Sequence, residues 1–511
     1  MGPTYLELIR QGALTYTDRT AIVFDDKTLT YTQVDTLSSQ LARAFVALGA
    51  MRGTRVALLV NNGLYSVPID FACVKTGINR VPLNSRLSLE EHTRMLGDIG
   101  CTMLVFGADL AERAAALQAA LPALQCHGLG AGIGNGNGKD LLDLAAQQPA
   151  GAPDIDAQPD DVILTLYTSG TTGTLKAAQH TQASYAGICR NVLLNLMAVT
   201  QDDVMLHAAS LVHASGVFVL PFWLRGGKTV ILPAFEPTAY LKALTTHRVT
   251  AINLVPTMLQ MLLDAPAFAQ TDVSALRQVI YGASPMPRAV INRAMQHWGR
   301  HRFWQYYGQT EVPLCIAVLR PEDHTEELLG ACGRPALDVE LRLLDEQGQQ
   351  VPPGTPGEIV VRAPSAVAGY YNATELNADT FRQGWVHTRD IGMLDSRGYL
   401  HIKDRTSDMI ITGGYNVYPR EVEDALSLHP AVKECAVVGT ADDKWVEAVT
   451  AVVVLHDGQS ASQQELTDWV AERLASYKKP RHVIFSAEIP KTAVGKINRK
   501  QLRDKLKTSP V

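Results

Sequence analysis

The sequence predicts an α/β protein, because helical and strand patterns alternate from its start and short apolar runs follow the helical stretches. Apolar side chains recur on one face of a helix that Gly49 is placed to end, namely Val34, Leu37, Leu41, Phe45 and Leu48. The apolar run 55–60 that follows has the length of a buried strand. Alternation of this kind is typical of largely parallel sheets covered by helices.

Two changes of texture divide the rest of the chain. Between 334 and 400, short strand-like runs alternate with turn residues, which predicts a small β-rich subdomain. After Asp404 we expect a helix from Pro419 to Leu428, strands near 434–439 and 448–455, and a helix from about Ser462 to Ala475. The predicted architecture is therefore a large N-terminal domain of α/β subdomains over residues 1–403 and a smaller α+β domain over 404–511.

The composition is that of an ordinary globular protein. The 511 residues are 46% hydrophobic and 19% charged, with a formal charge of −5, so nothing in the balance indicates a nucleic-acid partner. The seven cysteines form no Cys-x-x-Cys pair and are expected to be free thiols. No apolar run reaches the length of a membrane span and no signal segment opens the chain, so we expect a cytoplasmic location. A basic stretch over 473–507 is a solvated surface or a patch for a phosphorylated ligand.

The segment 167–176, Tyr-Thr-Ser-Gly-Thr-Thr-Gly-Thr-Leu-Lys, is the chain's densest collection of groups that bind phosphate. Its hydroxyls donate hydrogen bonds, its glycines let the backbone approach an anion, and its lysine adds charge. The strand expected before it would place the segment at a strand's carboxyl end, where open α/β sheets bind ligands. A flexible surface loop is the alternative, and the spacing is not that of a Walker loop. The candidate residues are Thr168, Ser169, Gly170, Thr171, Thr172, Gly173, Thr174 and Lys176.

Six further segments follow this loop in order. They are His213 in Ser-Leu-Val-His-Ala-Ser-Gly, Gly282-Ala-Ser-Pro285, Tyr307-Gly-Gln-Thr-Glu311, His387-Thr-Arg-Asp-Ile-Gly392, Asp404-Arg405 leading to Gly413-Gly-Tyr-Asn416, and Pro490-Lys-Thr-Ala-Val-Gly-Lys496. With these motifs the chain resembles the adenylate-forming enzymes, the superfamily of acyl-CoA ligases, firefly-type luciferases and peptide-synthetase adenylation domains. The resemblance covers nearly the whole chain.

The resemblance implies that ATP and Mg²⁺ activate a carboxylic acid. Lys176 and the loop hydroxyls would hold the β- and γ-phosphates, while Glu311 and Thr168 would help to position Mg²⁺, which prefers oxygen ligands. Asp390 would accept from the ribose hydroxyls, Arg405 would donate near the ribose and phosphate, and Tyr307 would face the adenine. Further nucleotide-site residues carried over from the family are Gly282, Ala283, Ser284, Gln305, Tyr306, Gly308, Thr310 (catalytic) and Ile402.

The resemblance also implies a second half-reaction with coenzyme A (CoA). Lys496 resembles the family's mobile catalytic lysine, and Asp404 falls at the hinge about which the C-terminal domain would rotate between the two steps. The pantetheine arm would pass Gly413 and Gly414, with Trp445 beside it and Lys479 and Arg481 near the nucleotide phosphates of CoA. His213 would stand between the acyl pocket and the thiol, and a packed core histidine is the alternative.

The segment 410–423 resembles acyl-CoA ligases more than peptide-synthetase domains, so a free-standing ligase that makes acyl-CoA is favoured. The alternatives are an enzyme that loads a separate carrier protein, a ligase acting mainly on a preformed acyl-adenylate, and a degenerate adenylate-binding protein without activity. Departures from the family pattern keep these alternatives open: Leu175 and Ala177 flank Lys176, Arg389 replaces a usual glycine, and Val446 follows Trp445 where glycine is common.

The expected acyl pocket is formed by residues around 213–218, 254–258, 282–284 and 309–313. These are mainly apolar or small and include no Lys or Arg that could pair with a second carboxylate. An aliphatic or aromatic monocarboxylic acid is therefore the expected substrate. A homodimer is the default expectation for a soluble enzyme.

Overall fold

The computed structural model describes residues 2–131, 139–169, 175–211, 214–405, 408–412, 415–442, 445–492 and 496–508. A seven-stranded sheet has the order β18-β8-β7-β4-β3-β5-β6. The strands from β7 to β6 are mutually parallel, whereas β8 runs antiparallel to both β7 and β18. The strands span Arg55–Leu59 (β3), Asn79–Pro82 (β4), Met103–Gly107 (β5), Gln125–Leu129 (β6), Val162–Ser169 (β7), Leu175–Thr181 (β8) and Gly369–Tyr370 (β18).

A nine-stranded sheet has the order β15-β14-β13-β12-β11-β9-β10-β1-β2. Its six middle strands, from β13 to β1, are parallel, and antiparallel strands extend both edges. The strands span Thr20–Phe24 (β1), Lys27–Thr30 (β2), Val204–His207 (β9), Lys228–Ile231 (β10), Ala251–Leu254 (β11), Gln278–Gly282 (β12), Phe303–Gln309 (β13), Val312–Leu319 (β14) and Arg334–Pro335 (β15). The predicted α/β class with largely parallel sheets is thus confirmed.

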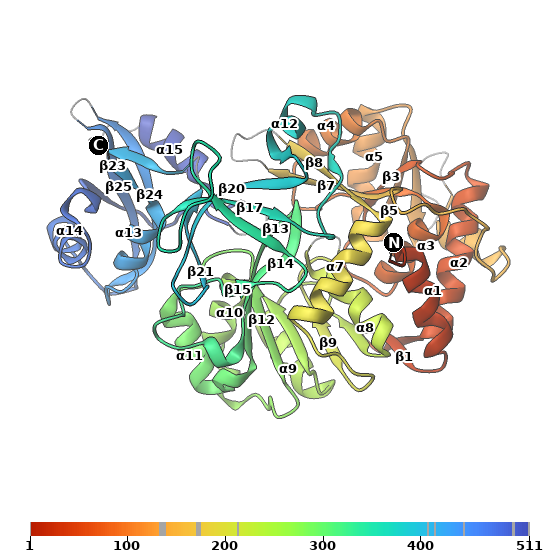
Figure 1. Cartoon of the computed structure of the whole chain (residues 1–511). Helices are drawn as coiled ribbons and strands as arrows, with labels where there is room; N and C mark the ends of the chain where they lie inside the picture. The colour runs from red at the N-terminus through yellow and green to blue at the C-terminus, as the bar shows by residue number, and fades with distance from the viewer. Residues whose placement is uncertain are drawn as a thin grey trace.

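Eleven of the described helices accompany these two sheets, and the largest core lies between the sheets (Figure 1). This core includes Ile163 of the first sheet and Ile280 of the second. The helix α7 packs between the two sheets, and most of its apolar residues are buried. The helices are Tyr5–Thr15 (α1), Tyr31–Ala47 (α2), Ser66–Thr76 (α3), Leu89–Ile99 (α4), Ala111–Ala120 (α5), Leu141–Ala146 (α6), Gln182–Asn195 (α7), Val219–Arg225 (α8), Pro237–Thr246 (α9), Pro256–Leu263 (α10) and Arg288–Trp298 (α11).

The predicted β-rich subdomain is a five-stranded antiparallel sheet. Its order is β16-β17-β20-β19, and β21 pairs with β20. The apolar faces of these strands pack on Tyr307 and Ile316, which join the subdomain to the nine-stranded sheet. The elements are Glu340–Leu344 (β16), Gly357–Arg362 (β17), Thr374–Thr380 (α12), Phe381–Arg382 (β19), Trp385–Leu394 (β20) and Leu400–Arg405 (β21).

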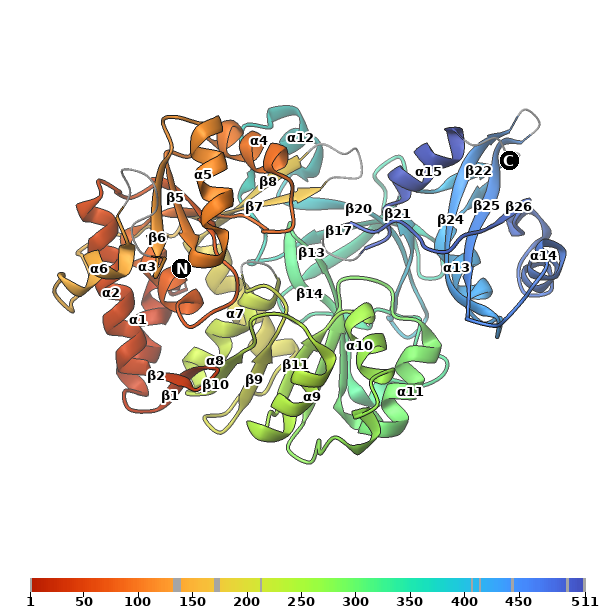
Figure 2. The ribbon, with the colours of Figure 1, turned by 180° about the vertical axis from the view of Figure 1, so that it is seen from behind.

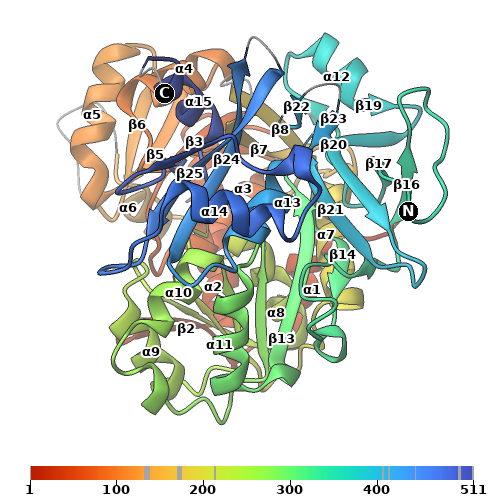
Figure 3. The same ribbon diagram turned by 90° about the vertical axis from the view of Figure 1, so that its left-hand side faces the viewer.

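The C-terminal domain is a smaller α+β unit at one end of the molecule. In Figure 3 it lies in front of the N-terminal sheets. Its sheet has the order β23-β22-β25-β24, with β26 beside β25. Alternate residues of β24 face two cores, one under α13 and α14 and one under α15. Figures 1 and 2 show α15 on the side facing the N-terminal domain. The elements are Ile410–Thr412 (β22), Tyr415–Val417 (β23), Pro419–Leu426 (α13), Val432–Asp442 (β24), Val446–Leu455 (β25), Gln463–Ala471 (α14), His482–Phe485 (β26) and Arg499–Thr508 (α15).

The structure corrects one sequence prediction, qualifies a second and leaves a third as a prediction. The helix expected to reach Ala475 ends at Ala471. Part of the basic stretch 473–507 is neutralised within the domain, because Arg499 pairs with Glu423 at 2.5 Å and Arg503 with Asp408 at 3.1 Å. The boundary at Asp404 and the mobility of the C-terminal domain remain predictions. None of the helices in the described ranges is both long and apolar enough to cross a membrane.

Buried histidines make the fold sensitive to acid. Burial lowers the pKa of His180 and His207 to about 3 and that of His324 to about 4, from an ordinary 6.5. Below pH 6.5 the unfolded chain therefore binds protons that the folded protein excludes, and the free energy of unfolding should fall by up to about 1.4 kcal/mol per pH unit for each histidine. Urea denaturation at pH 7, 6 and 5 measures this slope, which His324→Gln should reduce by up to about 1.4 kcal/mol per pH unit. Equal stability at pH 7 and pH 5 would show that these side chains are not buried in the neutral form.

Candidate active site

The expected phosphate loop joins two antiparallel strands. Thr168 near the end of β7 faces Lys176 near the start of β8 across this hairpin. Thr168 and Lys176 are both half-buried, and the Lys176 ammonium lies 5.6 Å from the centre of the Tyr370 ring. Gly170, Thr171, Thr172, Gly173 and Thr174 lie outside the described residues, as does the side chain of Ser169. The described part therefore fixes the two ends of the loop at the carboxyl end of β7.

Thr310 and Glu311 form a tight turn between β13 and β14, because Gln309 pairs with Val312. Gly308 is required before this turn, since a Cβ there would lie 2.3 Å from the Leu314 carbonyl oxygen. The half-buried Glu311 accepts a hydrogen bond from the Tyr370 hydroxyl. The predicted phosphate lysine and the predicted magnesium ligand thus contact the same tyrosine.

Asp390 is buried on β20 and accepts a hydrogen bond of 2.6 Å from the Tyr307 hydroxyl. Burial and the adjacent carboxylate hold the pKa of Tyr307 well above its usual value, so the hydroxyl stays a donor. Arg405 lies opposite Asp390 on β21. Two predicted nucleotide residues, 83 positions apart, are therefore brought into direct contact.

The segment 282–284 follows the end of β12. Gly282 pairs with Tyr306, and a Cβ on Gly282 would lie 2.4 Å from the Tyr306 carbonyl oxygen, so only glycine permits this approach. Ala283 adopts a positive φ of 66°, and Ser284 is half-buried. The chain therefore bends at Ala283 and Ser284, directly after the end of β12.

Three other carried-over residues have mainly structural contacts. Gln305 is buried and accepts a hydrogen bond of 3.2 Å from Tyr281. Tyr306, on the opposite face of β13, belongs to the core between the two sheets. Ile402 packs against the core of the β-rich subdomain. Their nucleotide contacts remain predictions, and His213 lies outside the described residues.

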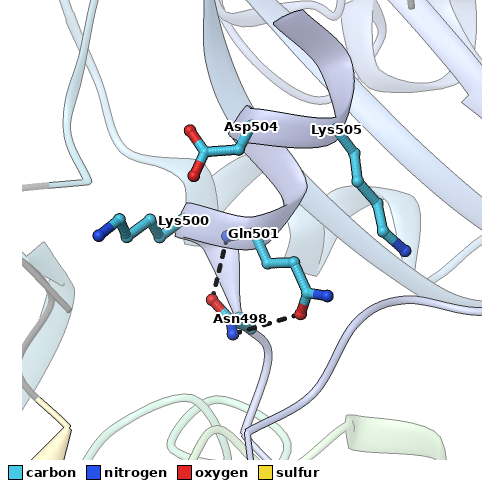
Figure 4. A pocket seen from close by; sticks show the side chains of 5 residues that line it. All are labelled: Asn498, Lys500, Gln501, Asp504 and Lys505. Atoms are coloured by element: carbon cyan, nitrogen blue, oxygen red, sulfur yellow. Dashed lines mark hydrogen bonds between the residues drawn. The ribbon is translucent and has the colours of Figure 1, made fainter. Parts of the chain in front are cut away.

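Lys496 is an exposed residue at the end of a short hairpin beside α15. Its carbonyl accepts from the Thr492 amide at 2.7 Å, and its own amide donates to the Thr492 hydroxyl at 3.2 Å. Asn498 then caps α15, because its side-chain oxygen accepts from the Gln501 amide at 3.1 Å (Figure 4). The shallow depression drawn there is lined by Asn498, Lys500, Gln501, Asp504 and Lys505 and does not include the nucleotide residues above. The backbone of Lys496 is therefore held by Thr492 through two hydrogen bonds, and the residue is exposed.

Two of the predicted CoA residues stack on each other. The Arg481 guanidinium lies 3.9 Å from the centre of the Trp445 ring. Lys479 is half-buried two residues before Arg481, whereas Gly413 and Gly414 lie outside the described residues. An aromatic face and basic groups are thus available together on the C-terminal domain.

The departures at Arg389 and Val446 retain the backbone conformation that glycine favours. Both have positive φ, 61° for Arg389 and 69° for Val446, and such strain costs of order 1–3 kcal/mol at each site. Arg389 also pairs with Asp379 of α12 at 3.0 Å. Both residues therefore adopt a backbone conformation that glycine would adopt without strain.

Sequence reasoning missed two residues. Tyr370 follows Gly369 on β18 and belongs to none of the motifs quoted above. Arg420 of α13 is largely buried. Burial raises the pKa of the Cys332 thiol in the N-terminal domain, and the positive charge of Arg420 partly opposes that shift. Arg420 is thus close enough to affect a buried thiol of the N-terminal domain, although nothing in its local sequence pattern shows this.

The residues present fit a magnesium ion that arrives with a nucleotide. In the described ranges, no three or more His, Cys, Asp or Glu side chains are grouped to hold a metal by themselves. Mg²⁺ bound to a nucleotide needs only one or two protein oxygens, because phosphates and waters complete its shell. The Glu311 carboxylate and the Thr168 hydroxyl are of the right kind.

Comparisons with known proteins show the family of the chain. Residues 9–371 match the AMP-binding enzyme family and residues 421–496 its C-terminal domain. The chain is 38% identical to a feruloyl-CoA synthase of Amycolatopsis (95% of each chain) and 37% identical to a medium/long-chain-fatty-acid–CoA ligase of Mycobacterium tuberculosis (98% of this chain, 90% of the other). The solved structure of an amide bond synthetase from Marinactinospora thermotolerans is similar, with a TM-score of 0.91 and 30% identity over 98% of this chain and 100% of that one. The chain belongs to the AMP-binding enzyme family and, within it, to the adenylate-forming acyl-CoA ligases, which use ATP, Mg²⁺ and CoA.

Proposed function

We propose that this ligase activates an aliphatic or aromatic monocarboxylic acid and transfers the acyl group to CoA. The cluster of Lys176, Tyr370 and Glu311 carries the proposal, because a cation and a carboxylate contact the same tyrosine beside the hairpin that would bind the pyrophosphate. The expected acyl-pocket segments contain no Lys or Arg for a second carboxylate. A relative named for an aromatic acid and one named for fatty acids support both substrate classes.

In the first step a carboxylate oxygen would attack the α-phosphorus of ATP, and the bond to pyrophosphate would break. Both reactants are anions, so the site must supply positive charge and hold them in line. Lys176 would hold the leaving pyrophosphate, Lys496 would approach the carboxylate and α-phosphate, and Asp390 would accept from the ribose hydroxyls. Mg²⁺, held by Glu311 and Thr168, would neutralise phosphate charge.

In the second step the thiolate of CoA would attack the acyl carbonyl, and AMP would leave with the bridging oxygen. We propose that the C-terminal domain rotates about Asp404, which withdraws Lys496 and presents Gly413 and Gly414 to the pantetheine arm. Trp445, Lys479 and Arg481 would hold CoA, and His213 would stand beside the thiol. The contact of Arg481 with Trp445 supports this assignment.

A panel of acids tests the proposal in two assays. Hydroxycinnamic, benzoic, medium-chain fatty and dicarboxylic acids are offered for pyrophosphate exchange with ATP, and acyl-CoA is measured in parallel, with a carrier protein as the competing acceptor. We expect exchange and acyl-CoA with at least one monocarboxylic acid and none with dicarboxylic acids. Consumption of a supplied acyl-adenylate without exchange for any acid would refute the two-step proposal. Faster acylation of a carrier protein than of CoA would refute the proposal that CoA is the acyl acceptor.

We also propose a cytoplasmic location, which the seven buried free thiols support. A homodimer remains a prediction.

A further inference from the structure

Tyr370 contacts two charged groups, Lys176 and Glu311, to which the sequence assigned separate roles in binding phosphate and Mg²⁺. It is on β18, paired with Ala178 of β8, so it lies beside the strand that begins with Leu175 and Lys176. Its hydroxyl donates to Glu311 Oε1, and its ring centre is 5.6 Å from Lys176 Nζ. One side chain thus contacts the carboxylate through its polar end and the ammonium through its ring.

The position of Tyr370 is fixed by its surroundings. Its amide donates to Asn377 Oδ1 at 2.7 Å, and the Asn377 side chain donates back to the Tyr370 carbonyl at 2.8 Å. The ring packs on Phe381 with centroids 5.6 Å apart, and only 4% of the residue is exposed. The helix that carries Asn377 is in turn tied to β20 by the ion pair of Asp379 with Arg389, at 3.0 Å.

The turn that carries Glu311 is attached to the same segment. The Glu311 carbonyl accepts from the Val367 amide at 3.0 Å, so main chain and side chain of Glu311 are both held by the segment 367–370. A carboxylate held in this way loses little further conformational freedom when it binds a metal ion.

We propose that Tyr370 is a positioning residue for the magnesium–ATP complex, because it occupies one oxygen of Glu311 and leaves the other oriented toward the metal. This inference rests on the proposed function and adds a residue that does not itself touch the substrates. A tyrosine hydroxyl keeps its proton at neutral pH, so it can donate to the Glu311 carboxylate. Partners of this kind usually change metal affinity by about 10- to 100-fold.

Tyr370→Phe tests the inference because it removes the hydroxyl and keeps the ring beside Lys176. Mn²⁺, observed by electron paramagnetic resonance, replaces Mg²⁺ in a titration of the full-length protein with a non-hydrolysable ATP analogue. We expect the dissociation constant for Mn²⁺ to rise about 10- to 100-fold. In the ligase reaction, the Mg²⁺ concentration that gives half of the maximal rate should rise, while kcat at saturating Mg²⁺ is largely retained.

Tyr371→Phe is the matched control. The Tyr371 hydroxyl accepts from Arg55 at 2.7 Å and therefore serves a different contact one residue away. Its removal should leave Mn²⁺ affinity unchanged. In a Glu311→Gln background, Tyr370→Phe should cause no further loss of affinity if the two residues act together.

Equal Mn²⁺ affinity in wild type and Tyr370→Phe would overturn the positioning role alone. The same loss in Tyr370→Phe and Tyr371→Phe would also overturn it, because a general disturbance of β18 would then explain both. A wild-type protein that binds no Mn²⁺ with the analogue would overturn the inference together with the proposed function.

Discussion

Lys496→Ala is expected to lower the rate of adenylation by about 100- to 1,000-fold and to leave thioester formation largely intact. The lysine would stabilise charge that develops only as the carboxylate attacks phosphorus, and removal of one such group typically has an effect of this size. Its side chain is exposed and its backbone is held by Thr492, so truncation should not disturb the fold. Pyrophosphate exchange measures the first step, and acyl-CoA formation from a synthetic acyl-adenylate measures the second.

Lys491→Ala provides a control from the same hairpin. Lys491 pairs with Glu434 at 3.0 Å and should affect neither half-reaction. Equal loss of both half-reactions in Lys496→Ala would contradict a role confined to adenylation.

Asp390→Ala is expected to slow both half-reactions, in contrast to Lys496→Ala. Both ATP and the acyl-adenylate carry the ribose, and each hydrogen bond to a charged group contributes about 1.5–3 kcal/mol. Loss of two such bonds corresponds to a fall of about 100- to 10,000-fold in kcat/KM for either nucleotide. Initial rates over a range of ATP and of acyl-adenylate concentrations measure the two values.

Tyr307→Phe separates the ribose contact from the internal one. This variant removes only the hydroxyl that donates to Asp390, at 2.6 Å in the structure, and should change kcat/KM less than Asp390→Ala does. An equally large loss in Tyr307→Phe would indicate that Asp390 acts by holding the tyrosine rather than the ribose.

The architecture could be predicted because its signals are local. The face formed by Val34, Leu41 and Phe45 is buried as expected in α2, and the run 55–60 contains the strand Arg55–Leu59, with every apolar residue of the run buried. The end of α14 was harder to predict from the sequence, because the helical pattern of side chains continues to Ala475 whereas the helix ends at Ala471. Helix ends depend on capping and tertiary contacts that periodicity does not contain.

The site was only partly predictable, because its contacts join distant parts of the chain. Family motifs in a fixed order identified Tyr307 and Asp390, yet the hydrogen bond between them exists only because β20 packs near β13. Tyr370 belongs to no quoted motif, and it reaches Glu311 through the pairing of β18 with β8. Likewise, the sequence shows Arg389 and Val446 as departures but does not reveal that both keep a positive φ.

Transfer of isotopic oxygen tests the adenylate route most directly. The acid that gives the most acyl-CoA in the panel is labelled with ¹⁸O in both carboxyl oxygens and incubated with ATP, Mg²⁺ and CoA. If the carboxylate attacks the α-phosphorus and the thiol then displaces AMP, the AMP isolated after complete turnover should contain one ¹⁸O atom in its phosphate. Unlabelled AMP, or label in inorganic phosphate formed together with ADP, would contradict the account.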